Sequence, residues 1–165
     1  MRPKLLIPLD ASSASREAAL KAIRCAGRHH MDVVGHFIAP PFRYRSLVNL
    51  VKSGHFRREK YAKAMIDAAE EHFSGLEAAS KSARVRFSGV FSYSNNVVDE
   101  VVLSACKFLC GMIYVDAGEV GYFRLRKQGN IARKISARCE IPVLVRHAAT
   151  DDAGAPPARI AGATD

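Results

Sequence analysis

Five short, mostly apolar runs alternate along the chain with longer segments in which apolar residues recur at helical spacing. Most of these runs lack the alternation of polar and apolar residues that marks a strand with one face in solvent, so they predict strands buried on both faces. Such strands, each followed by a helix, form a parallel sheet between two layers of helices. We therefore predict an α/β fold: a doubly wound five-stranded parallel sheet with helices on both faces. The strand centres are expected at residues 5–9, 33–38, 85–90, 112–115 and 143–145.

Four helices are expected between and after these strands, because apolar residues recur there at intervals of three and four. The longest pattern is Ala62, Met65, Ile66, Ala69, Phe73 and Leu76. A later helix is expected to place Val98, Val101, Val102, Ala105 and Leu109 on its apolar face. Cys106 and Cys110 are four residues apart in this segment, which predicts a reduced pair buried along one helix edge.

The chain has 165 residues, 48% of them hydrophobic, which is enough for one domain with a full core. We assign residues 1–147 to the α/β domain. Residues 148–165 are mostly Ala, Gly, Pro, Thr and Asp, so a disordered tail is expected there. No apolar run approaches the roughly 20 residues of a membrane span, and the one after Met1 is too short for a signal peptide. We therefore expect a cytoplasmic protein with no membrane partner.

Three stretches of the chain, in their order, carry a family resemblance: LLIPLDAS at 5–12, MIYV at 112–115, and GNI at 129–131 followed by IPVLVR at 141–146. Together they resemble the universal stress protein family over about residues 4–147. The resemblance implies a doubly wound α/β domain with a role in stress response. It also implies a homodimer joined through the final strand, at Val143, Leu144 and Val145. Some members of that family bind ATP and others do not.

The resemblance also points to a nucleotide site, which in ATP-binding members includes a loop of the form G-x2-G-x9-G-[ST]. Here Gly118 and Gly121 are followed by a spacer of seven residues and then by Gly129 and Asn130, so the spacer is two short and Asn replaces Ser or Thr. Alternatively, counting back from Gly129 at full length puts Asp116 and Glu119 where glycines belong. Either change weakens a phosphate site, because carboxylates repel phosphate. We therefore expect ATP binding to be weak or lost and no cofactor to be held, with ATP kept as an alternative ligand.

The candidate site nonetheless keeps several features of a nucleotide or anion site. Asp10 and Ala11 stand where the family has its nucleotide-contacting Asp and the turn after it, and Asn130 is a good helix cap. Arg124 and Lys127 supply cations in the loop. The candidate residues are Asp10, Ala11, Gly118, Gly121, Arg124, Lys127, Gly129 and Asn130. We also expect the basic segments 42–60 and 122–127 to lie on the same side of the sheet as Asp10, around a cationic cleft.

The leading interpretation is a non-enzymatic, homodimeric binding or regulatory protein in stress response. The alternative is a member that binds ATP and hydrolyses it slowly. A second alternative is a basic protein docking on nucleic acid or an acidic partner, since the net charge is +9. Nucleic acid is disfavoured because no recognition module is present. No catalytic residue is assigned, since the serines after Asp10 form no G-x-S-x-G elbow, and no metal site is expected from the histidines. His36 is predicted to be an interior, hydrogen-bonded residue.

Overall fold

The computed structural model describes residues 2–42, 54–116 and 131–146. These residues form one five-stranded sheet in the order β3-β2-β1-β4-β5. Every hydrogen-bonded strand pair is parallel, which confirms the predicted sheet. The strands are β1 (Lys4–Leu9), β2 (Asp32–Ala39), β3 (Phe87–Tyr93), β4 (Met112–Asp116) and β5 (Val143–Arg146).

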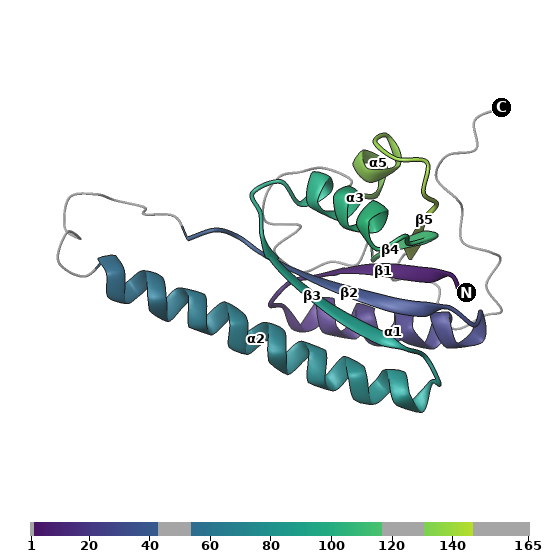
Figure 1. The fold of residues 1–165 in the computed structure, drawn as a ribbon, viewed down its shortest axis with the longest axis horizontal. Helices are drawn as coiled ribbons and strands as arrows, with labels where there is room; N and C mark the ends of the chain where they lie inside the picture. Colours follow the sequence, from purple (N-terminus) through teal and green to yellow (C-terminus); the bar gives the residue numbers. More distant parts are fainter. Residues whose placement is uncertain (1, 43–53, 117–130, 147–165) are drawn as a thin grey trace.

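Two helices cover each face of the sheet in the part of the chain that the structure describes, as the ribbon shows (Figure 1). The pair α1 and α2 packs on one face, and the pair α3 and α5 packs on the other. Side chains of β1 alternate between the two cores: Leu5, Ile7 and Leu9 belong to the first and Leu6 to the second. This alternation explains why the run is apolar at consecutive positions. The helices are α1 (Ser13–Arg28), α2 (Gly54–Ser82), α3 (Val97–Lys107) and α5 (Ile131–Ser136).

Two glycines set the spacing between α2 and the sheet. Gly35 of β2 and Gly89 of β3 are direct partners in the strand register. A Cβ atom on Gly35 would lie 2.8 Å from the Phe87 ring, and one on Gly89 would lie 2.9 Å from the Phe73 ring. The missing side chains therefore make room for the two aromatic rings, which lie 6.1 Å apart between centroids.

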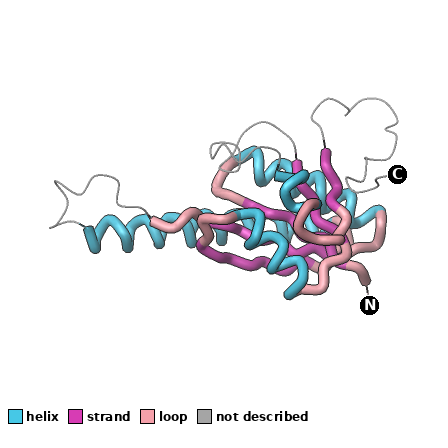
Figure 2. Tube along the Cα trace, turned by 90° about the horizontal axis from the view of Figure 1, so that it is seen from above, coloured by secondary structure: helices cyan, strands magenta, loops and turns pink. Residues whose placement is uncertain are grey.

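The helix α2 begins at Gly54, well before the apolar pattern that starts at Ala62. The apolar pattern that predicts this helix therefore does not reveal its first turns. Its first turns extend beyond the sheet as an arm, visible from two directions (Figure 1; Figure 2). Residues 57–60 are exposed there, so they need no apolar face and leave no periodic signal. The arm is tied to the end of β2 where the Tyr61 hydroxyl donates to the Pro40 carbonyl at 2.6 Å.

Helices α1, α2 and α3 end in the same way, with a non-glycine residue in the left-handed conformation. The residues are His30, Arg84 and Leu109, with φ angles of 55°, 56° and 55°. In each case the next residue donates its N–H to a carbonyl five positions earlier, which is the Schellman arrangement. The residues that close the three motifs are Met31, Val85 and Cys110, all buried.

This ending corrects two predictions about α3. Leu109 was expected on the apolar face of the helix, but it lies past the helix end and is 75% exposed. Cys106 and Cys110 do not share a buried edge, because the left-handed residue between them turns the chain: Cys106 is exposed and Cys110 is buried. Both thiols are free, as predicted.

Candidate functional site

Asp10 lies at the carboxyl end of β1 and is almost completely buried, with 2% of its surface exposed. One carboxylate oxygen, Oδ1, accepts hydrogen bonds from the backbone N–H of Ser12, at 2.9 Å, and from the Ser12 hydroxyl. The Ser12 hydroxyl oxygen in turn accepts from the N–H of Ser15 at 3.1 Å, which caps the start of α1. Ser12 is therefore the helix cap, and it holds the Asp10 carboxylate in one orientation.

The other carboxylate oxygen of Asp10, Oδ2, is buried and has no hydrogen-bond partner among the residues that the structure describes. Buried polar atoms in proteins are almost always hydrogen-bonded, so an orphaned one requires a reason. A carboxylate oxygen is an acceptor only, and its missing partner is therefore an N–H or O–H donor. Since the carboxyl edge of a doubly wound sheet is where ligands bind, a ligand donor fits this position.

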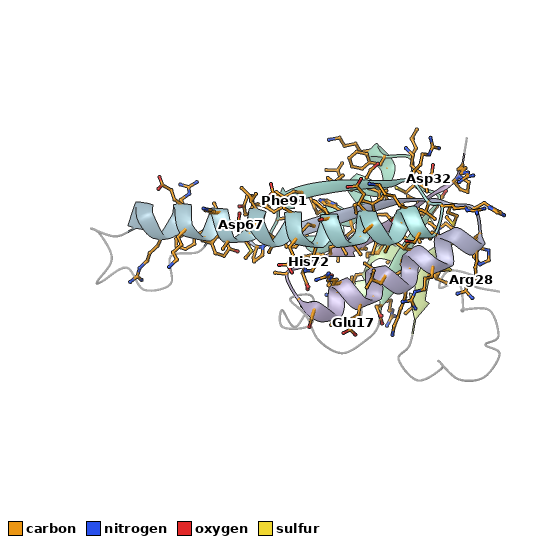
Figure 3. The ribbon with its side chains drawn as sticks, turned by 90° about the horizontal axis from the view of Figure 1, so that it is seen from below. Glu17, Arg28, Asp32, Asp67, His72 and Phe91 are labelled. Atoms are coloured by element: carbon orange, nitrogen blue, oxygen red, sulfur yellow. The ribbon has the colours of Figure 1, made fainter. Side chains whose placement is uncertain are left out.

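A second buried polar side chain lies near Asp10, on α2. His72 is 6% exposed, packs edge-on against the Phe37 ring at 5.7 Å between centroids, and sits on the side of α2 that faces α1 (Figure 3). Burial lowers the pKa of His72; Arg16 lowers it further, and the Asp10 and Glu71 carboxylates oppose the shift. Its Nδ1 has no hydrogen-bond partner among the described residues. His72 thus adds a buried polar atom that is near enough to Asp10 for the two side chains to interact electrostatically.

The sequence reasoning missed His72, although a signal was present. Position 72 is three residues after Ala69 and four before Leu76, so it lies on the same apolar face of α2 as these two residues. A histidine in that row is expected to be buried. It was overlooked because the neighbouring residues Glu70 and Glu71 make this stretch look solvent-facing.

His36 lies on the other face of the sheet, within β2, and is completely buried. Its Nε2 is 2.8 Å from the Ser92 hydroxyl oxygen, which confirms that it is a hydrogen-bonded interior residue. A carboxylate oxygen of Glu100 is 3.7 Å from the same nitrogen. Because serine and acid approach one nitrogen rather than opposite ones, this group is not a Ser-His-acid triad. Burial lowers the pKa of His36, Glu100 raises it and Lys107 lowers it.

A shallow groove runs along the outside of α3, between Asn96, Leu103 and Arg138. Its charged groups already have partners: Asp99 pairs with Arg138 and accepts from the Asn96 side chain. We therefore do not assign the site to it.

The structure places only part of the predicted site. Asp10 and the exposed Ala11 follow β1, and Asp116 ends the neighbouring β4, so they share the carboxyl edge. The remaining candidates, Gly118, Gly121, Arg124, Lys127, Gly129 and Asn130, lie outside the described residues. Within the described ranges, no group of three His, Cys, Asp or Glu side chains could hold a metal ion. No helix of the described chain is long and apolar enough to span a membrane.

The comparison with family models decides the family. The model of the universal stress protein family matches residues 1–147. The chain belongs to the universal stress protein family. A search of the curated proteins found no match for this universal stress protein.

Solved structures similar to this universal stress protein share its fold. A universal stress family protein from Burkholderia pseudomallei is 16% identical, with a TM-score of 0.63, over 87% of this chain and 94% of that one. A universal stress protein in complex with cAMP is 15% identical, with a TM-score of 0.57, over 88% and 97%. A third, from Archaeoglobus fulgidus and in complex with dAMP, is 13% identical, with a TM-score of 0.53, over 88% and 97%. At these identities the likeness concerns the fold alone.

Proposed function

We propose that this universal stress protein is a regulatory binding protein in stress response that recognises a nucleotide at the carboxyl edge of its sheet, and that its affinity for ATP is weak. One observation carries the proposal: Asp10 is buried and fixed by Ser12, yet its Oδ2 has no partner among the described residues. A ribose hydroxyl or the exocyclic amine of a base supplies the donor that this oxygen lacks.

A buried carboxylate discriminates between the parts of a nucleotide. It attracts hydroxyl and amine donors and repels phosphate, so Asp10 fits the nucleoside part. The phosphates would then face the loop that begins at Asp116, whose acids Asp116 and Glu119 oppose a polyphosphate. This balance favours a nucleoside monophosphate or cyclic nucleotide over ATP. The structures similar to this chain that hold cAMP and dAMP support the same choice.

The alternative is a member that binds ATP and hydrolyses it slowly. Arg124 and Lys127, together with the helix start that the sequence predicts at Gly129 and Asn130, favour it, because cations and backbone N–H groups at a helix start bind phosphates. The two candidates share Asp10 and differ in the loop. Affinity measured as a function of phosphate number therefore separates them.

Calorimetric titration with AMP, cAMP and ATP tests the proposal. We expect AMP or cAMP to bind more tightly than ATP, and Asp10→Asn to weaken binding by about tenfold or more. Asparagine keeps one oxygen to accept from Ser12 but replaces the Oδ2 acceptor with a donor. The matched control is Asp67→Asn, the same substitution at an exposed carboxylate of α2. Binding that is tightest for ATP would favour the alternative, and unchanged binding in Asp10→Asn would exclude Asp10 from the site.

We further propose that two copies of the protein associate through β5. This strand pairs with β4 on one side only, and it ends the order of the described sheet. An edge strand with unpaired backbone groups is a ready template for a second strand. Val143 is buried, and Leu144 and Val145 are half-buried, so the edge is apolar as well.

A cytoplasmic location, tested by cell fractionation, stays a prediction.

A further inference from the structure

The edge of the sheet opposite Asp10, where the strands begin, gathers positive charge. We define this amino edge as residues 2–4, 28–32, 81–86 and 107–112. These are the residues around the starts of β1 to β4, and they hold seven Lys or Arg residues against one carboxylate, that of Asp32. That carboxylate is already neutralised by Arg86, whose Nε and Nη2 lie 2.9 and 2.6 Å from Asp32 Oδ2. Lys81 is paired as well, with Glu77 one turn earlier in α2 at 3.1 Å. Arg28 and Asp32 lie together at this end of the molecule (Figure 3). The seven cations are Arg2, Lys4, Arg28, Lys81, Arg84, Arg86 and Lys107.

Only some of these cations serve to complement the negative ends of helix dipoles. Three helices end at the amino edge, and the cations of their last turns, Arg28, Lys81 and Lys107, complement the negative ends of those helices. Arg84 and Arg86 lie outside the helices and are exposed. The Arg86 side chain keeps 75% of its surface exposed even while it bonds Asp32. The side chains of Arg28 and Arg84 have no partner among the described residues, so they are available to an external anion.

Three side chains at this edge occupy a backbone conformation that favours glycine. His30, Arg84 and Leu109 all have a φ near 55°, and all three are exposed. Each residue belongs to the Schellman motif that ends its helix, which accounts for its left-handed backbone. Their side chains belong to neither core cluster and are left exposed to solvent.

The strand order places the turns that carry these three side chains next to one another at this edge. The turns with Arg84, His30 and Leu109 precede β3, β2 and β4, and the amino end of β1 lies between the last two. With strands about 4.8 Å apart, these turns span roughly 15 Å along the sheet. The Arg2 side chain donates to the Arg84 carbonyl at 3.4 Å, and Lys4 Nζ donates to the Phe108 carbonyl at 3.0 Å. The surface therefore carries cations along its length and an exposed apolar side chain, Leu109, before β4.

We propose that the amino edge is a docking surface for an acidic protein segment that also carries an apolar side chain. The cations face its carboxylates, and Leu109 contacts its apolar residue. Nucleic acid fits less well, because no Phe, Tyr or Trp of the described amino edge is exposed for base stacking, since Phe108 is half-buried.

The test uses the full-length protein and labelled peptides, followed by fluorescence anisotropy at low and physiological salt. One peptide contains Glu, Asp and two central Leu residues, and a second has Ser in place of Leu. We expect the first peptide to bind more tightly, and Arg28→Glu with Arg84→Glu to weaken it by about tenfold. The matched control is Lys60→Glu with Lys63→Glu, the same charge reversal on the exposed arm of α2. This control should bind like the wild type.

A glycine variant separates docking from folding. Leu109→Gly should raise the melting temperature by about 2–4 °C, because it relieves the left-handed strain. It should also weaken binding of the Leu-containing peptide by roughly fivefold, while binding of the Ser-containing peptide stays unchanged. A variant that is more stable yet binds less well cannot be explained by a structural role alone.

Several results would overturn the proposal. One is equal loss of binding in the variants of the arm and of the amino edge. Another is tighter binding of oligothymidylate, or of vesicles containing phosphatidylglycerol, than of the Leu-containing peptide. A third is absence of peptide binding at low salt. None of these bears on nucleotide binding at Asp10, which lies at the opposite edge, so the two proposals fail independently.

Discussion

Arg86 donates two hydrogen bonds to a single carboxylate oxygen of Asp32, from Nε at 2.9 Å and from Nη2 at 2.6 Å. Asp32 begins β2 and Arg86 immediately precedes β3, so the pair ties together the starts of two neighbouring strands. The second oxygen of Asp32 is buried without a partner in the described part of the chain. The carboxylate therefore depends on Arg86.

The first prediction follows from this dependence. The Arg86 hydrogen bond lowers the pKa of Asp32, with a further electrostatic contribution from Arg86, while burial opposes the shift. A depressed folded-state pKa stabilises the fold above the ordinary value of 3.8, and this contribution disappears as the pH falls through the folded-state pKa. Arg86→Met should thus lower the melting temperature at pH 7 and make little difference below that range. Thermal unfolding of the wild type and of Arg86→Met across pH 2–7 measures this difference in melting temperature. A loss of melting temperature that is equal at all pH values would contradict the ion-pair explanation.

The second prediction concerns the two buried histidines. Burial lowers the pKa of His36 and of His72 from the ordinary value of 6.5. The unfolded chain therefore takes up protons first, and stability is full above pH 6.5 and falls as the pH drops through the folded-state pKa values. Urea unfolding between pH 4 and pH 8 should show this slope. His36→Gln should remove part of the slope, and adding His72→Gln should remove more. A slope that persists in the double variant would assign it to other groups.

The third prediction tests the packing of α2 on the sheet. Gly89→Ala would place a methyl group 2.9 Å from the Phe73 ring, and its nearest atoms include the ring carbon closest to the backbone, which cannot easily move away. Overpacking of this kind destabilises by about 1–3 kcal/mol. The control is Gly111→Ala, whose Cβ would have its nearest neighbour, Pro3, at 4.0 Å. Urea unfolding should separate the two, and a Gly89→Ala protein as stable as the control would show that the ring has room to shift.

The fourth prediction tests the proposed dimer. Leu144→Lys places a charge in the apolar edge of β5, and Val143→Pro removes a backbone donor from the strand, so both should yield monomers. Light scattering measures the mass, and circular dichroism confirms that the variants fold. Two folded variants that remain dimeric would locate the interface elsewhere.

Periodicity was sufficient to predict the inner strands of the sheet, because a strand buried on both faces must be apolar at consecutive positions, as β1 and β2 are. The edge strand β3 is exposed at several positions, and it begins at Phe87 rather than at Val85. The same reasoning failed at Leu109. An apolar residue at helical spacing was assigned to the core, but a Schellman turn takes the chain out of the helix before that position. Pattern alone does not distinguish the last turn of a helix from the residue after it. The arm of α2 was missed for a related reason, since a helix that contacts no core needs no apolar face.

The order of residues alone determined the alternation of strand and helix, the parallel sheet between two cores, and the place of Asp10 at the end of the first strand. These features depend on local spacing, and local spacing is visible in the chain. The tertiary structure decided which side chains from distant segments meet: His72 behind Asp10, Glu100 beside His36, and Arg86 on Asp32. It also decided that the cations of four separate segments converge on one edge. Such contacts depend on strand order and helix orientation. Both arise from long-range packing, which cannot be predicted from any single stretch of sequence.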